Sequence, residues 1–215
     1  MRYVDRTLCA LALAALGACA SNPAADAQRQ GRASPPAPAP SVPATTPVAV
    51  DAQAQKAFDE ARRAFAAGQM AQAERGFLAL TQSNPELGGP FAALGQIYLQ
   101  AGKPAEAVQQ FEAAVRASPK QPAYLNQLGV AYRQQGQFDK AREAYEQAMA
   151  LAPDYAAPML NLGILNDLYL DDGPRALELY ERYLLLTPAG DATVSKWVVE
   201  LKGRKPPTLA AKGKS

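Results

Sequence analysis

The chain has 215 residues, with 22 Lys and Arg against 20 Asp and Glu, so its formal net charge is only +2. A balance this even gives no electrostatic reason to expect a nucleic-acid partner. The chain contains no His, and its 2 Cys stand at positions 9 and 19, which excludes catalysis by His and, beyond residue 19, a disulfide framework or a Cys/His metal site.

Residues 1–18 have the pattern of a secretory signal peptide. Arg2 and Arg6 precede a short apolar run of Leu and Ala, which is too short to span a bilayer stably. The run ends in Leu-Gly-Ala-Cys19, which resembles the bacterial lipobox, where cleavage precedes a lipidated Cys. We therefore expect a lipoprotein signal peptide over 1–18 and lipid on Cys19. An ordinary signal peptide with an incidental Cys, or a short buried helix, is the alternative.

The residue after this Cys bears on the membrane to which the chain would be anchored. In the lipoproteins that this segment resembles, an Asp at that position favours retention in the inner membrane. Ala20 stands there instead. The resemblance therefore implies an outer-membrane lipoprotein that faces the periplasm.

Residues 19–50 contain many prolines and few large apolar side chains, so they predict a disordered tether rather than a packed element. The prolines are Pro23, Pro35, Pro36, Pro38, Pro40, Pro43 and Pro47. A segment of about 30 residues at ~3.1 Å per residue reaches roughly 90 Å in a polyproline II conformation. It would hold the following domain away from the membrane, or serve as a spacer without preferred contacts.

Two near-copies of one pattern lie 34 residues apart between Pro90 and Pro153. The first consists of Phe91, Leu94, Gly95, Tyr98, Gly102, Ala107, Phe111, Ala114 and Pro119. The second consists of Leu125, Leu128, Gly129, Tyr132, Gly136, Ala141, Tyr145, Ala148 and Pro153. Apolar residues at helical spacing, a Gly where one helix ends and a Pro after the second predict an antiparallel helix pair. Such a pair must bury its apolar face against neighbouring pairs.

This spacing of Leu-Gly, Tyr, Ala, an aromatic residue and Pro resembles the signature of tetratricopeptide repeat (TPR) proteins. The resemblance implies an all-α fold, a right-handed α-solenoid of about four TPR helix pairs with a C-terminal capping helix. The TPR domain would cover 51–189. Its repeats would fall at about 54–87, 88–121, 122–155 and 156–189.

The two outer repeats depart from the pattern. In the first, Glu60-Ala61 replaces Leu-Gly, and degenerate terminal repeats are expected where one side meets solvent. In the fourth, the turn between its helices carries one extra residue and contains Asp171 and Asp172. Two adjacent carboxylates lack the ligand count of a calcium loop, so we expect a solvated turn that caps the next helix.

The C-terminal segment divides into a helix and a tail. Residues 190–203 predict a capping helix, with Asp191 as N-cap and Trp197 in an apolar stripe that packs on the fourth repeat. The basic tail, 204–215, has no acid and is expected to be disordered; contact with anionic lipid or nucleic acid is the alternative.

The resemblance also implies a partner-binding groove along the first helix of each repeat. Carried over position by position, the groove residues are Asp59, Arg62, Gln96, Leu99, Gln100, Asn126, Val130, Arg133, Gln134, Leu160, Ile164 and Asp167. The Lys/Asn clamp of chaperone-binding TPRs is missing. An amide-rich groove with Arg133 at its centre suits an extended peptide or a helix of low charge. The alternative is that these residues only solvate the surface, and that the convex face or the tail binds.

The absence of activated nucleophiles and of a phosphate-binding glycine loop indicates a protein that is not an enzyme and needs no cofactor or metal. We expect a protein-protein interaction scaffold that binds a protein or peptide of the cell envelope, with no nucleic-acid partner. It resembles TPR lipoproteins of pilus assembly, such as pilotins and the tight-adherence pilus lipoprotein, and TPR proteins of TonB/ExbB-type complexes. A structural, peptidoglycan-associated lipoprotein is the alternative.

Overall fold

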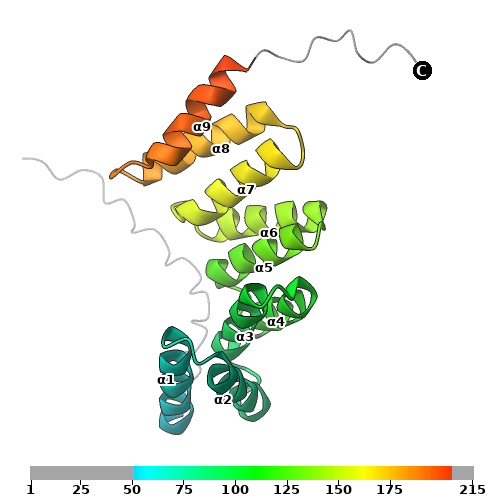
Figure 1. Ribbon diagram of the computed structural model, residues 1–215, viewed down its shortest axis with the longest axis vertical. Helices are drawn as coiled ribbons and strands as arrows, with labels where there is room; N and C mark the ends of the chain where they lie inside the picture. Colours follow the sequence, from blue (N-terminus) through cyan, green and yellow to red (C-terminus); the bar gives the residue numbers. More distant parts are fainter. Residues whose placement is uncertain (1–50, 205–215) are drawn as a thin grey trace, which may run out of the picture. The chain divides into compact units, whose positions relative to one another are not determined.

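The computed structural model describes residues 51–204, and these fold into α-helices joined by short turns (Figure 1). The helices are α1 (Ala52–Ala66), α2 (Met70–Ser83), α3 (Gly88–Gln100), α4 (Pro104–Ala117), α5 (Pro122–Gln134), α6 (Phe138–Leu151), α7 (Ala156–Leu168), α8 (Gly173–Leu186) and α9 (Ala192–Gly203). The expected signal peptide, Cys19, the tether and nearly all of the basic tail lie outside the described residues.

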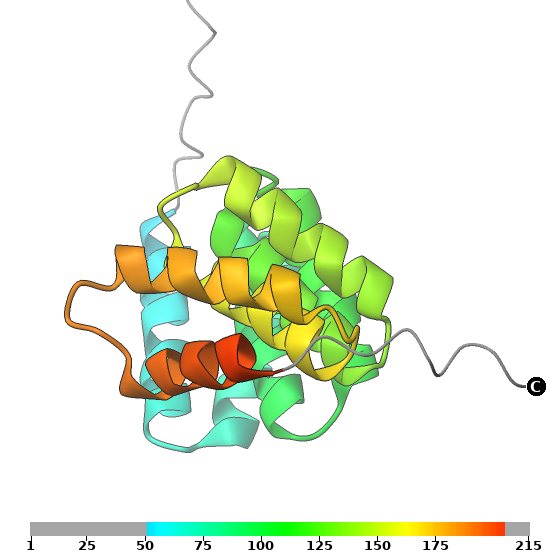
Figure 2. The same cartoon turned by 90° about the horizontal axis from the view of Figure 1, so that it is seen from above.

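Helices that follow one another in the chain pack against one another, so the fold grows by adding neighbours. The pairs α1/α2, α3/α4, α5/α6 and α7/α8 form the four repeats, and α9 packs on α8 (Figures 1 and 2). The first helices of neighbouring repeats also meet, because α5 contacts α7 directly. The predicted fold class, an all-α solenoid of four helix pairs with a capping helix, is confirmed.

A residue with positive φ ends the first helix of each repeat. Gly68, Gly102 and Gly136 have φ of 74°, 70° and 76°, and nothing lies within 4 Å of where their Cβ would be. Glycine adopts this left-handed conformation without the steric cost that other residues incur. In the fourth repeat, whose turn has the extra residue, Asp171 takes this conformation with φ 52°. Asp is one of the few other residue types that tolerate it.

The glycine of each Leu-Gly pair lies against the aromatic ring of the following helix. A Cβ at Gly95 would lie 2.7 Å from the ring of Phe111, and a Cβ at Gly129 would lie 2.5 Å from the ring of Tyr145. These separations are below van der Waals contact, so a side chain there would displace a buried ring. The repeat signature therefore records a contact between the two helices of a pair.

The first repeat brings its two helices together through a different close contact. Ala61 stands where the other repeats have glycine, and the missing space is supplied by Gly76 on α2. A Cβ at Gly76 would lie 2.8 Å from the Cβ of Ala61. The repeat is degenerate in sequence but keeps close packing between its helices.

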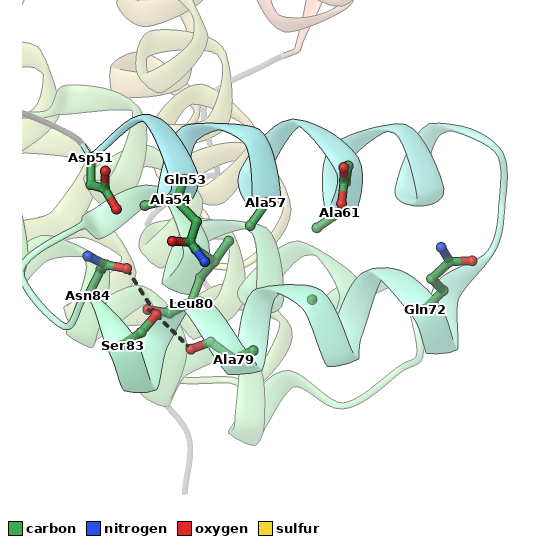
Figure 3. A pocket seen from close by; sticks show the side chains of 12 residues that line it. Asp51, Gln53, Ala54, Ala57, Ala61, Gln72, Ala79, Leu80, Ser83 and Asn84 are labelled. Atoms are coloured by element: carbon green, nitrogen blue, oxygen red, sulfur yellow. Dashed lines mark hydrogen bonds between the residues drawn. The ribbon is translucent and has the colours of Figure 1, made fainter.

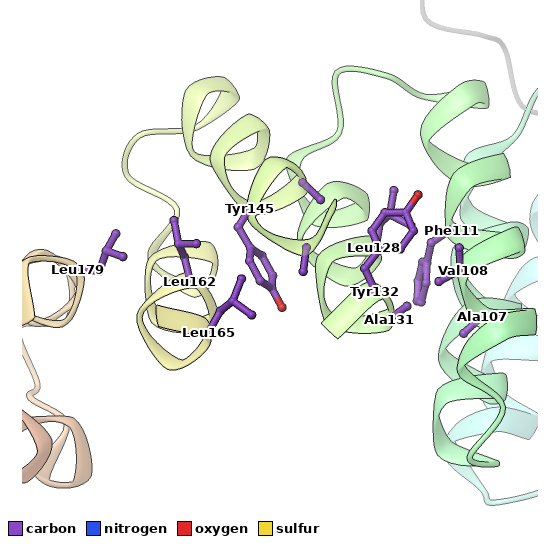
Figure 4. Packing of buried hydrophobic residues seen from close by; sticks show 12 residues of the cluster. Ala107, Val108, Phe111, Leu128, Ala131, Tyr132, Tyr145, Leu162, Leu165 and Leu179 are labelled. Atoms are coloured by element: carbon purple, nitrogen blue, oxygen red, sulfur yellow. The ribbon is translucent and has the colours of Figure 1, made fainter. Parts of the chain in front are cut away.

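The central core joins the second, third and fourth repeats. Figure 4 shows Tyr145 of α6 together with Leu128 of α5 and with Leu162 and Leu165 of α7, so the cluster draws on three helices. Phe111 and Tyr145 are both 0% exposed. Burying aromatic side chains contributes about 1.5–3 kcal/mol each relative to exposure, so this cluster is the main source of cohesion between repeats.

Two of the acids that the sequence marks as caps accept backbone hydrogen bonds. Asp172 accepts from the amide of Arg175 at the start of α8, and Asp191 accepts from Thr193 and Val194 at the start of α9. The prediction that this turn caps the next helix is therefore confirmed for Asp172. Among the helices of residues 51–204, none is long and apolar enough to cross a membrane.

Candidate functional site

The candidate groove residues lie on α1, α3, α5 and α7, the first helix of each repeat. Because the repeat length is constant, residues 34 positions apart occupy equivalent places in neighbouring repeats. One such row consists of Leu99, Arg133 and Asp167. We call the surface formed by the twelve predicted groove residues the A-helix face.

Arg133 lies at the centre of this face and is half-buried. Its guanidinium carbon is 5.8 Å from the centroid of the Tyr169 ring, a cation-π distance. Its Nε is buried and has no hydrogen-bond partner among the described residues, and the same is true of the Tyr145 hydroxyl. Burial raises the pKa of Tyr145, and the nearby Arg133 partly offsets that rise. Arg133 therefore lies over the Tyr169 ring and near Tyr145, and no carboxylate among residues 51–204 is paired with it.

Asn126 occupies a different environment from the one expected. It is 5% exposed, and its Oδ1 accepts a hydrogen bond of 2.9 Å from Nδ2 of Asn161 on α7. Asn126 is therefore more buried than a side chain that lines an open groove, although the sequence places it among the groove residues. Its oxygen already has a partner, and the side chain helps to join the third and fourth repeats. Val130, one turn further along α5, is partly buried against the central core.

The C-terminal end of the A-helix face is covered by α9. Leu160 and Ile164 pack against the cluster formed by α8 and α9, in which the rings of Tyr180 and Trp197 lie 5.5 Å apart. Asp167, whose side chain is 11% exposed, accepts a hydrogen bond of 3.1 Å from Arg204. The sequence did not predict this pair, because Arg204 looked like part of a solvated basic tail.

The N-terminal part of the face remains accessible. Asp59 pairs with Arg62 at 3.5 Å on the same helix and accepts a hydrogen bond from Gln55. Gln96 is partly exposed, and Gln100 and Gln134 are exposed. Leu99 is partly buried against the central core. The side-chain amides of Gln96, Gln100 and Gln134 are free to donate to and accept from a peptide backbone.

A hollow of about 500 Å³ lies between α1 and α2 at the N-terminal end of the described residues (Figure 3). Its walls are mostly small side chains, among them Ala54, Ala57 and Ala61. At one end, Ser83 donates hydrogen bonds to Asn84 and to the carbonyl of Ala79. Polar and charged side chains, among them Glu60 and Gln72, also line the hollow, whereas small-molecule sites are lined mainly by apolar and aromatic side chains.

No cluster of three or more metal-ligating side chains occurs within residues 51–204. The groups with a clear pKa shift there are all tyrosines, and in each case the pKa is raised, with burial as the largest cause. Tyr98 donates to Glu74 over 3.0 Å and Tyr132 donates to Glu112 over 2.6 Å, which ties each helix to the preceding repeat. These shifts follow from repeat packing and do not assemble an acid-base site.

Comparisons with known proteins agree with this geometry. Residues 92–156 match the family model described as Tetratricopeptide repeat. No curated protein matches the chain. The crystal structure of MamA protein is 22% identical, with a TM-score of 0.62 over 70% of this chain and 82% of that one. PilF of Pseudomonas aeruginosa is 19% identical, with a TM-score of 0.62 over 69% and 67%. The first TPR of Spaghetti (RPAP3), bound to an HSP90 peptide, is 23% identical, with a TM-score of 0.50 over 53% and 88%.

The stacked helix pairs define an α-solenoid of the class that other proteins use as docking surfaces. Residues 92–156 carry tetratricopeptide repeats, and the helix pairs of residues 51–204 share the fold of TPR proteins. Proteins of this kind generally act as non-enzymatic scaffolds that bind protein or peptide partners, and this fold supports the same general role here.

Proposed function

We propose that this protein is an outer-membrane lipoprotein whose TPR domain docks an extended segment of a cell-envelope protein and thereby assists the assembly of an envelope complex of the pilus/secretion or TonB/ExbB type. The docking role rests on one observation: Arg133 lies over the Tyr169 ring at the centre of the A-helix face, and no carboxylate of the described residues is paired with it.

The chemistry of the face indicates what it would bind. A guanidinium that is already oriented can hold one carboxylate through charge-assisted hydrogen bonds. Gln96, Gln100 and Gln134 flank it and can pair with the amides and carbonyls of a peptide backbone. The partner segment is therefore extended, low in charge and carries one acid near its middle.

The docking role is tested with Arg133→Ala in the full chain, against a partner found by crosslinking. Losing hydrogen bonds to a charged group weakens binding by about 1–3 kcal/mol, as measured by calorimetry. Arg116→Ala is a matched control, because Arg116 is an exposed arginine on α4 away from the A-helix face. Full affinity in Arg133→Ala would place the binding surface elsewhere.

The anchoring role is supported by the lipobox-like segment that ends in Cys19 and by Ala20 after it. Cys19→Ser should release the protein from membranes or leave an unprocessed precursor. Mass spectrometry of the mature chain checks this directly, and an unmodified Cys19 there would end the proposal. Binding to purified sacculi in the absence of protein partners would instead favour the peptidoglycan-associated role.

A further inference from the structure

A second hollow, of about 360 Å³, lies where α3 begins, and we call it the α3 pocket. Two aromatic residues from different repeats line it, Phe58 on α1 and Tyr124 on α5. Gly88 and Gly89 lie between them at the start of α3. Glu86 is the one charged residue that lines the pocket.

Packing requires a glycine at only one of the two positions, Gly88 and Gly89. A Cβ at Gly88 would lie 2.8 Å from both Tyr124 and Ser118, and 2.9 Å from the carbonyl oxygen of Ala114, so packing requires a glycine there. A Cβ at Gly89 would lie 3.4 Å from Phe58 and 3.8 Å from the Tyr124 hydroxyl, which are ordinary contacts. Packing therefore does not require Gly89. Its missing side chain leaves open space between the two aromatic residues.

The residues of the α3 pocket depart from the repeat pattern together. The positions equivalent to Gly88-Gly89 are Pro122-Ala123 in the third repeat and Ala156-Ala157 in the fourth. The positions equivalent to Phe58 carry Ala92, Asn126 and Leu160. Because the other repeats fold without these residue types, the repeat architecture alone does not account for their meeting at one place.

The lining indicates the chemistry of a ligand. The rings of Phe58 and Tyr124, with Gly89 between them, can accept a compact apolar ring, as do the aromatic grooves that bind proline-rich peptides. The N-cap residue of α3, Leu87, provides no side-chain acceptor for the first-turn amides, so these can donate to a ligand carbonyl. A polyproline II segment has all of its carbonyls free. Glu86 repels a carboxylate and attracts a cation, which favours a neutral or basic ligand.

We propose that the α3 pocket binds a proline side chain in an extended segment of a partner protein, at a point where the residues next to the proline are neutral or basic. The inference rests on the proposed docking role and names the chemistry of the segment. Phe58 precedes Asp59 of the A-helix face on α1, and the N-terminal part of that face is accessible, so one extended chain that lies along it can reach the pocket. Burial of the Tyr124 ring also raises the pKa of that tyrosine, as expected for a hydroxyl at the edge of an apolar pocket.

The test uses the full chain labelled with nitrogen-15 and three synthetic peptides, acetylated and amidated, with the cores Lys-Pro-Ala-Pro, Lys-Ala-Ala-Ala and Glu-Pro-Ala-Pro. We expect the first peptide to shift the amide signals of Gly88 and Gly89. The peptide without proline should bind roughly tenfold more weakly, and the peptide with Glu several times more weakly. Equal binding of the first two, or shifts confined to other residues, would overturn the proposal.

Gly89→Ala provides a matched variant, since it introduces the residue type found at the equivalent positions of the third and fourth repeats and fills the space between the rings. The variant should have the melting temperature of the wild type and bind the Lys-Pro-Ala-Pro peptide roughly tenfold more weakly. Gly203→Ala is the control, because nothing lies within 4 Å of where its Cβ would be. If Gly89→Ala lowers the melting temperature, Tyr124→Leu replaces it, with the same weakening expected. Unchanged affinity in the folded variant would overturn the proposal.

The two proposals fail separately. Weak binding of the proline peptide to wild type would remove the α3 pocket as a proline site and leave the role of Arg133 intact. Unchanged partner affinity in Arg133→Ala would rule out the central docking site. Binding of the proline peptide that weakens in Gly89→Ala would still support the α3 pocket.

Discussion

Asn161 on α7 donates a hydrogen bond of 2.9 Å to Asn126 on α5, joining the first helices of two neighbouring repeats. Asn126 is 5% exposed. A buried amide without its partner loses solvation that nothing replaces, so the pair contributes to how the third and fourth repeats are held together.

Asn126→Ala should therefore lower the free energy of unfolding by about 0.5–1.5 kcal/mol, because the partly exposed Asn161 loses its acceptor, whereas Asn161→Ala leaves the buried oxygen of Asn126 without a donor and should cost about 1–3 kcal/mol. Urea denaturation measures the loss. Asn161→Ala and the double variant complete a cycle in which the two single losses should not add, since each breaks the same bond. Additive losses would mean that the hydrogen bond contributes nothing to stability.

Gly129→Leu should also destabilise the protein, for a steric reason. A Cβ at this position would lie 2.5 Å from the Tyr145 ring, and Tyr145 is 0% exposed, so the ring has no free space to move into. Overpacking of this kind costs about 1–3 kcal/mol or more. Thermal unfolding measures it, with Ala150→Leu on the exposed part of α6 as control. A melting temperature equal to wild type would contradict the contact between α5 and α6.

The sequence predicted the fold well because the repeat signature records contacts that recur in every repeat. Gly129 against Tyr145 is such a contact, since both residues belong to the pattern. Contacts that occur once leave no periodic signal. The close contact of Ala61 and Gly76 in the first repeat, and the pair of Arg204 and Asp167, were therefore not predicted.

The candidate site could be predicted only in part, for the same reason. Position within a repeat indicates which helix carries a residue, but not whether a neighbour covers it. Asn126 and Ile164 occupy groove positions of the pattern, yet one is buried against α7 and the other packs on the cluster of α8 and α9. Arg133 remained a candidate because Tyr169 holds it beside the core, and no periodicity shows that interaction.

Stability should fall at alkaline pH because of the buried tyrosines. Burial, together with the hydrogen bond to Glu112, raises the pKa of Tyr132 above its ordinary value of 10.0. A raised pKa in the folded state means that the neutral form stabilises the fold fully below pH 10, and that this contribution is lost as pH rises further. In Tyr132→Phe the decline of the unfolding free energy above pH 10 should be shallower. Urea titrations at several pH values measure it, and identical slopes in both proteins would contradict the prediction.

Two neighbouring basic residues at the end of α9, Lys202 and Arg204, form ion pairs that should contribute unequally to stability. Arg204 pairs at 3.1 Å with Asp167, whose side chain is 11% exposed. Lys202 pairs at 2.7 Å with Glu181, and both side chains are about half exposed. Exposed pairs contribute about 0–1 kcal/mol, whereas removing the partner of a largely buried acid costs more because its charge stays out of water. Arg204→Ala should therefore destabilise the protein more than Lys202→Ala, by urea denaturation.

A second substitution separates the two causes of that loss. If the penalty comes from the unpaired carboxylate of Asp167, then Asp167→Asn in the Arg204→Ala background should recover most of the lost stability, because a neutral amide costs less to bury than a charge. If Arg204 acts mainly by packing its stem on α7, the double variant should stay as unstable as Arg204→Ala. Recovery would show that α9 is held over the end of the A-helix face by charge pairing, and its absence would assign that role to apolar packing alone.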